Sequence, residues 1–131
     1  MPTPIRVLLA DTHEPGVEPL ASALRRRGIE VVAVSDHVVA QELIAAEHFD
    51  VVVIDVRLTG VRTANTITAI RKIDASTPVL LLAVGPELAR MGDVLRPGLA
   101  DFLLRPFPAE TLIAAIEDAS ERESCPNCCC D

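Results

Sequence analysis

Five short apolar runs, each continuous rather than alternating, constrain the fold of this chain most strongly. They are rich in Val, Ile and Leu and lie at Ile5–Ala10, Glu30–Val34, Val51–Asp55, Val79–Val84 and Ala100–Leu104. Continuous runs of this kind are typical of strands buried on both faces of a parallel sheet. Helix-like stretches follow the runs, at about Glu18–Arg27, Asp36–Glu47, Thr63–Ile73, Glu87–Leu95 and Pro108–Glu121. The alternation predicts an α/β fold with a doubly wound, five-stranded parallel sheet in the strand order 2-1-3-4-5.

Local residue patterns indicate where the first helix ends and where the second begins. Gly28 follows the first helical stretch and suits a helix C-terminus, because glycine tolerates the left-handed backbone that such ends often adopt. Ser35 or Asp36 precedes the second stretch, and either side chain can accept a hydrogen bond from the exposed amides of a helix N-terminus.

Length and composition limit the function classes. The chain has 131 residues, which corresponds to one domain at roughly 100–200 residues per domain. Its net charge of −7 and its supply of only three aromatic residues, all Phe, disfavour direct binding to nucleic acid or to an anionic membrane. The N-terminus lacks the pattern of a secretory signal, and no apolar run approaches the length of a membrane helix, so we expect a cytoplasmic protein.

Charged side chains follow the predicted strands at their carboxyl ends. Asp11 follows the first apolar run, Asp55 ends the third, and Arg105 follows the fifth. The carboxyl ends of strands one and three are neighbours in this strand order, so both carboxylates are expected to face one crevice, with Arg105 on its far wall. Two carboxylates can bind Mg²⁺, and a carboxylate can also attack phosphorus to form an aspartyl phosphate. A cation across the crevice would stabilise the added charge.

In these residues the sequence resembles the receiver domain of bacterial two-component response regulators. The resemblance covers about residues 5–119 and is carried by four segments in order, Ile5–Asp11, Phe49–Gly60, Thr77–Leu82 and Gly98–Phe107. It implies the flavodoxin-like (βα)5 fold. It also implies that Asp55 is the phosphoacceptor, and that Mg²⁺ is held by Asp11, Asp55 and the backbone carbonyl of Arg57.

The sequence departs from the family pattern at three site positions. Thr12 stands where the family has a second acidic metal ligand, Ala83 where it has the switch hydroxyl, and Arg105 where it has a phosphate-binding lysine. Loss of a carboxylate weakens a Mg²⁺ site, so we expect the ion to bind weakly or not at all. Loss of a hydrogen bond to a charged group is worth about 1.5–3 kcal/mol, which is enough to blunt a switch. Phe102 matches the switch aromatic, and Arg105 keeps the positive charge.

The resemblance implies a signalling module and not an enzyme. Its expected partners are a sensor histidine kinase or a downstream signalling protein, contacted through helix four, strand five and helix five. The same surface could support a homodimer. The changed site favours action with weak phosphorylation or none. Only about ten residues follow the last predicted helix, so we expect a receiver that stands alone; the alternative is a receiver from which a following effector domain has been removed. A conventional Mg²⁺-dependent response regulator remains open. So does a flavodoxin-like domain that binds a small molecule or nucleotide, although the first strand–helix turn lacks a glycine-rich phosphate loop.

The composition changes near the C-terminus. We expect residues 1–121 to form the receiver domain and residues 122–131 to form a disordered tail. All four cysteines lie in this tail, at Cys125, Cys128, Cys129 and Cys130. Exposed thiols are the expected state, because four thiolates within six residues can hardly surround one ion tetrahedrally. A metal site in one chain, or one shared by two chains, is the alternative.

Overall fold

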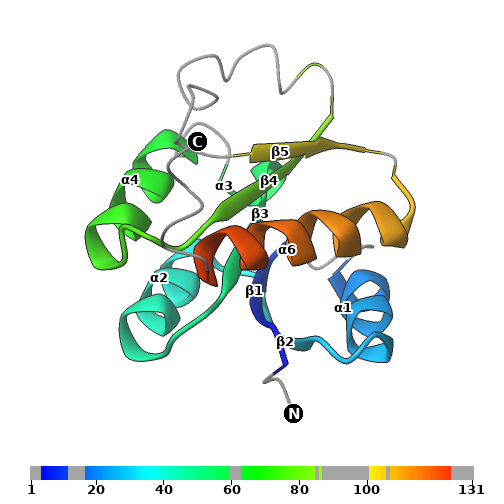
Figure 1. Ribbon diagram of the computed structural model, residues 1–131. Helices are drawn as coiled ribbons and strands as arrows, with labels where there is room; N and C mark the ends of the chain where they lie inside the picture. Colours follow the sequence, from blue (N-terminus) through cyan, green and yellow to red (C-terminus); the bar gives the residue numbers. More distant parts are fainter. Residues whose placement is uncertain are drawn as a thin grey trace.

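The sheet has the predicted architecture. A computed structural model describes residues 4–11, 17–59, 63–84, 86, 101–105 and 107–124. Its strands are β1 (Arg6–Ala10), β2 (Glu30–Val34), β3 (Val51–Asp55), β4 (Val79–Ala83) and β5 (Asp101–Leu104). All neighbouring strands are parallel, and their order is β2-β1-β3-β4-β5, as the sequence predicts. The strand order places the ends of β1 and β3 side by side (Figure 1).

Most of the helices also match the sequence prediction. They are α1 (Val17–Arg26), α2 (His37–Ala46), α3 (Val56–Thr59), α4 (Thr63–Ile73) and α6 (Ala109–Ser124). The short helix α3, directly after β3, was not predicted, and α6 continues past its predicted end at Glu121 to Ser124. The helix expected at Glu87–Leu95 and the four cysteines lie outside the described residues, whereas residues 122–124, expected to begin a disordered tail, belong to α6. Within the part of the chain that the structure describes, no helix is long and apolar enough to cross a membrane.

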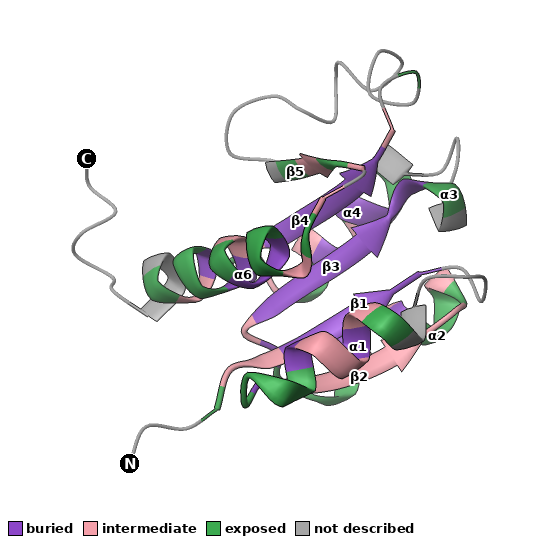
Figure 2. Ribbon diagram, turned by 90° about the vertical axis from the view of Figure 1, so that its right-hand side faces the viewer, coloured by how far each residue is buried: buried purple, intermediate pink, exposed green. Residues whose placement is uncertain are grey.

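Two apolar layers cover the sheet, because successive strand residues point to opposite faces. On one face, Leu8 and Val52 pack with Ile44 of α2 and Ile67 of α4. On the other face, side chains of β1, β3 and β4 pack with helices α1 and α6, and this layer includes Val7, Val53, Leu80, Leu24, Leu112, Ile113 and Ile116. The central strands β1, β3 and β4 are therefore buried between helices (Figure 2).

Two of the predicted helix ends have the expected local geometry. Gly28 follows α1 with a φ of 83°, in the left-handed region that glycine tolerates. Asp36 is the N-cap of α2, and its carboxylate accepts hydrogen bonds from the amides of Val38 (2.7 Å) and Val39 (3.3 Å). The sequence predicted either Ser35 or Asp36 as the N-cap, and in the structure the N-cap is Asp36.

The Asp36 cap yields a stability prediction. The Asp36→Ala variant loses both hydrogen bonds to the first turn of α2, so its free energy of unfolding should fall by about 1 kcal/mol. Urea denaturation followed by circular dichroism measures the change. The Asp36→Asn variant keeps a capping oxygen and should lie close to the native protein. Equal losses in the two variants would contradict a capping role.

Candidate functional site

The parallel register brings two aspartates together at one edge of the sheet. Ala10 of β1 pairs with Ile54 of β3, so the residues that follow them, Asp11 and Asp55, lie at the same level on adjacent strands. The backbone amide of Asp11 continues the pairing of β1 by donating to the carbonyl of Val34 (3.0 Å). The carboxyl ends of β1 and β3 thus place two carboxylates in one crevice, as the sequence predicts.

Both carboxylates are withdrawn from water. Asp11 and Asp55 each have 0% of their surface exposed, and they are the only charged residues among the buried ones that the structure describes. A buried carboxylate is costly unless it is paired and hydrogen-bonded. The crevice must therefore supply positive charge.

Arg105 supplies one of the compensating charges. Its Nη2 atom donates to Oδ2 of Asp55 (2.7 Å) and lies 3.2 Å from Oδ2 of Asp11. The backbone amide of Arg105 donates to the carbonyl of Ala83 (2.8 Å), which extends the pairing of β5 with β4 and fixes the start of the side chain. The predicted convergence of Asp11, Asp55 and Arg105 is confirmed.

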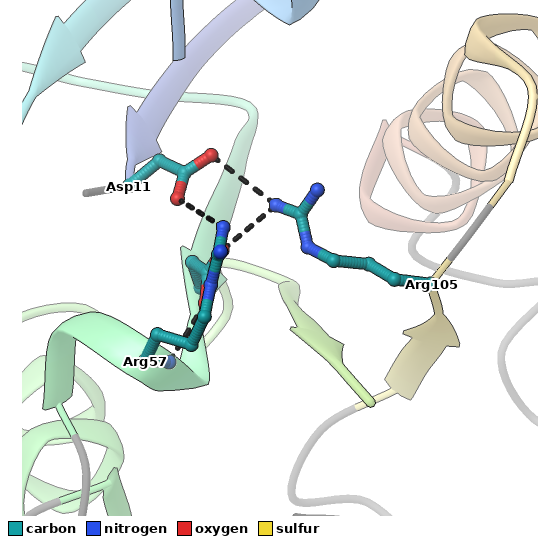
Figure 3. Close-up of polar contacts among 4 residues, drawn as sticks. Asp11, Arg57 and Arg105 are labelled. Carbon is teal, nitrogen blue, oxygen red and sulfur yellow. Dashed lines mark hydrogen bonds and ion pairs between the residues drawn. The ribbon is translucent and has the colours of Figure 1, made fainter. Parts of the chain in front are cut away.

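Arg57 supplies the second charge, through a side chain for which the sequence predicted no role. Its Nη2 and Nε atoms donate to Oδ2 of Asp55 at 2.7 and 3.1 Å, and Nε also lies 3.2 Å from Oδ1. Nη2 is 3.5 Å from Oδ1 of Asp11. Figure 3 shows the guanidinium groups of Arg57 and Arg105 approaching the carboxylate of Asp11 from different elements.

The short helix α3 positions Arg57. The backbone amide of Arg57 donates to Oδ1 of Asp55 (2.7 Å), so the first turn after β3 is held by the same carboxylate that the guanidinium contacts. An arginine two residues after a buried aspartate was the available sequence signal. Only the backbone carbonyl of Arg57 was predicted to act, and that role stays a prediction.

Opposing effects determine the pKa of Asp55. Burial by itself would raise the pKa, because a low-dielectric environment disfavours the charged form. The hydrogen bonds from Arg57, the interaction with Asp11 and the charge of Arg105 together outweigh burial, and the pKa lies below its ordinary value of 3.8. Asp55 is therefore a carboxylate at neutral pH.

The remaining predicted site positions are partly described. Ala83, at the position where the resemblance implies a switch hydroxyl, ends β4 and is buried. Phe102 lies on β5 and is 42% exposed. Thr12 lies outside the described residues.

The predicted Mg²⁺ site does not fit the crevice as it stands. Each of the four carboxylate oxygens of Asp11 and Asp55 already lies within 3.5 Å of an arginine nitrogen. Two carboxylates and two guanidinium groups have no net charge, so they offer little attraction to a cation. Among the described residues, no group of three or more His, Cys, Asp or Glu side chains could hold a metal ion.

The pKa of Asp55 yields a pH prediction. Because the folded-state pKa is depressed, ionised Asp55 stabilises the fold above the ordinary value, and this contribution is lost as the pH falls through the folded-state pKa. At pH 7 the free energy of unfolding of the Asp55→Asn variant should therefore be about 1–3 kcal/mol lower than that of the native protein, and the difference should narrow as the pH falls below the ordinary pKa of 3.8. Urea denaturation across this range measures it. Glu42→Gln, which removes an exposed carboxylate of α2, is the charge-matched control. A difference that stays constant with pH would contradict the depressed pKa.

Comparisons with known proteins identify the family. Residues 7–117 match the response regulator receiver domain. The chain is 30% identical over 122 residues to the transcriptional regulatory protein CutR of Streptomyces coelicolor, covering 93% of this chain and 56% of CutR. It is 32% identical over 122 residues to the probable transcriptional regulatory protein NarL of Mycobacterium tuberculosis, covering 92% of this chain and 56% of NarL. The chain thus spans about half the length of these relatives.

A solved structure has the same fold. The receiver domain of the Francisella response regulator 1452 superimposes with a TM-score of 0.78 at 25% identity, over 90% of this chain and 98% of that chain. The family match over most of the chain and the shared fold show that the chain belongs to the response regulator receiver domain family of two-component signal transduction.

Proposed function

We propose that this receiver domain signals by protein–protein contact with weak phosphorylation of Asp55 or none. Receiver domains are in general signalling modules that interact with histidine kinases and downstream effectors. The observation that carries the proposal is the pairing of Asp55 with two guanidinium groups, which together with the amide of Arg57 engage both of its oxygens. A carboxylate oxygen engaged in this way is a poor nucleophile until an arginine moves away.

The changed site residues support the same conclusion. Ala83 has no hydroxyl with which to bind a phosphoryl group, so an added phosphate at Asp55 would lack the donor that the family uses at this position. Arg105 is already bound to Asp11 and Asp55. Phosphorylation would have to break these contacts before new ones could form.

Arg105 also provides a path from the crevice to the surface. Its guanidinium lies 5.6 Å from the ring centre of Phe107, which packs against the same apolar layer as α6. Its backbone follows β5, where Phe102 and Leu104 each expose 42% of their surface. Leu103 packs with the layer that includes α6, so the exposed side chains of Phe102 and Leu104 point to the other face of β5. We propose the edge strand β5, together with the adjoining surface of α6, as the contact surface for a signalling protein or a second copy of the chain. The acidic net charge gives no support to nucleic acid as the direct partner.

Transcript profiling in cells tests this function, because a signalling protein changes the levels of the transcripts that depend on it. Profiles would be compared for the native gene, a deletion, Asp55→Asn and Phe102→Glu. We expect Asp55→Asn to retain the native profile and Phe102→Glu to resemble the deletion, because a charge on β5 opposes apolar docking. Glu42→Gln is a suitable control, because Glu42 is exposed on α2, which packs against β1 and β2, whereas β5 lies at the opposite edge of the sheet from β2. Leu103 is unsuitable, because it faces the apolar layer.

A direct phosphorylation assay separates the possible causes of a lost output. The native protein and Asp55→Asn would be incubated with acetyl phosphate and Mg²⁺, and intact mass would be measured. We expect little or no phosphoprotein in either sample. Stable phosphorylation of the native protein, together with loss of output in Asp55→Asn, would show a conventional response regulator and contradict the proposal.

A further inference from the structure

We propose that the guanidinium group of Arg57 is a resident cation of the Asp11–Asp55 crevice and takes the place that receiver domains give to a divalent metal. Mg²⁺ would then bind only when Arg57 is removed or displaced. This inference extends the proposed function, and it rests on that proposal in one respect: it takes the Asp11–Asp55 crevice to be the signalling site.

The hydrogen bonds at Asp55 leave little capacity for a metal ion. Five hydrogen bonds from arginine nitrogens reach its two oxygens, four from Arg57 and one from Arg105. A carboxylate offers about four lone-pair positions, so these donors saturate it. Mg²⁺ requires oxygen ligands at about 2.0–2.1 Å in a near-octahedral arrangement, which the engaged oxygens cannot provide.

Electrostatics act in the same direction. The carboxylates of Asp11 and Asp55 and the guanidinium groups of Arg57 and Arg105 carry formal charges that cancel. A divalent ion added beside them would be repelled by both arginines, and the repulsion is strong where water is excluded. Removal of the Arg57 side chain would leave a net negative formal charge in the crevice and would take away three of the five hydrogen bonds to Asp55.

Arg57 is better placed to leave the crevice than Arg105. Its side chain is 35% exposed, whereas that of Arg105 is 22% exposed. Arg57 is also tethered only two residues from Asp55, so it returns to the same carboxylate without diffusing from solution. Such a tether gives the guanidinium a high effective concentration against a metal ion that must bind from bulk solvent.

Metal titration of Arg57 variants tests the inference. The native protein, Arg57→Ala and Arg57→Gln would be titrated with Mg²⁺ and followed by amide NMR. Mn²⁺ would then be added to locate the ion by paramagnetic broadening. We expect saturable changes around Asp11 and Asp55 in both variants and an affinity at least about tenfold higher than that of the native protein. Both ions are hard and prefer carboxylates to thiolates, so the cysteines should not compete.

Arg25→Ala is the matched control, because it changes the net charge equally and Arg25 lies in the last turn of α1, where it donates to the carbonyl of Val31. It should respond to Mg²⁺ as the native protein does. Equal Mg²⁺ affinity in the native protein and the Arg57 variants would overturn the inference, as would folded variants that show no binding. If a variant is unfolded, recovery of its native spectrum on addition of Mg²⁺ supports the inference, and failure of both variants to recover overturns it.

Different measurements overturn the role of Arg57 and the proposed function. Tight Mg²⁺ binding by the native protein would overturn the role of Arg57 and leave contact through β5 and α6 untouched. Stable phosphorylation of the native protein, together with loss of cellular output in Asp55→Asn, would overturn the proposed function, whatever the Arg57 titration shows.

Discussion

The burial of two carboxylates at the ends of adjacent strands is the constraint on which the rest of the site depends. Parallel pairing of β1 with β3 puts Asp11 and Asp55 at one level, and the apolar layers on both faces of the sheet keep water away. A buried carboxylate that loses its partner destabilises a fold, because its charge is left uncompensated. The chain meets this requirement with arginines from α3 and from the end of β5.

This form of compensation has a functional consequence. In a receiver domain whose site charges are balanced by a metal ion and a phosphoryl group, binding of these groups changes the contacts of the site residues. Here the balance is complete within the chain, so a ligand must first displace an arginine. Of the two arginines, Arg105 is the one that links the site to the proposed contact surface, because its backbone follows β5 and its side chain lies near Phe107. Movement of its guanidinium group would therefore alter the packing next to the surface that we propose for partner binding.

The sequence predicted the fold well because strand burial and helix periodicity are local patterns. The runs at Glu30–Val34 and Val51–Asp55 and the helix at Thr63–Ile73 have the predicted bounds. The convergence of Asp11, Asp55 and Arg105 followed from strand order alone. The side chain of Arg57 was missed because its contacts depend on the unpredicted turn α3 and on the reach of a long side chain, neither of which appears in a residue pattern.

The most direct test of this account is to observe the Nε–H group of Arg57 in solution by ¹⁵N–¹H NMR. Its Nε atom donates to Asp55, so the account predicts a signal that exchanges slowly with water and that is shifted from those of exposed arginines. The signal should persist in millimolar Mg²⁺ and disappear or move in Asp55→Asn. A rapidly exchanging Arg57 signal at the position of a free arginine would contradict the account, because the two carboxylates would then lack the cation that the structure assigns to them.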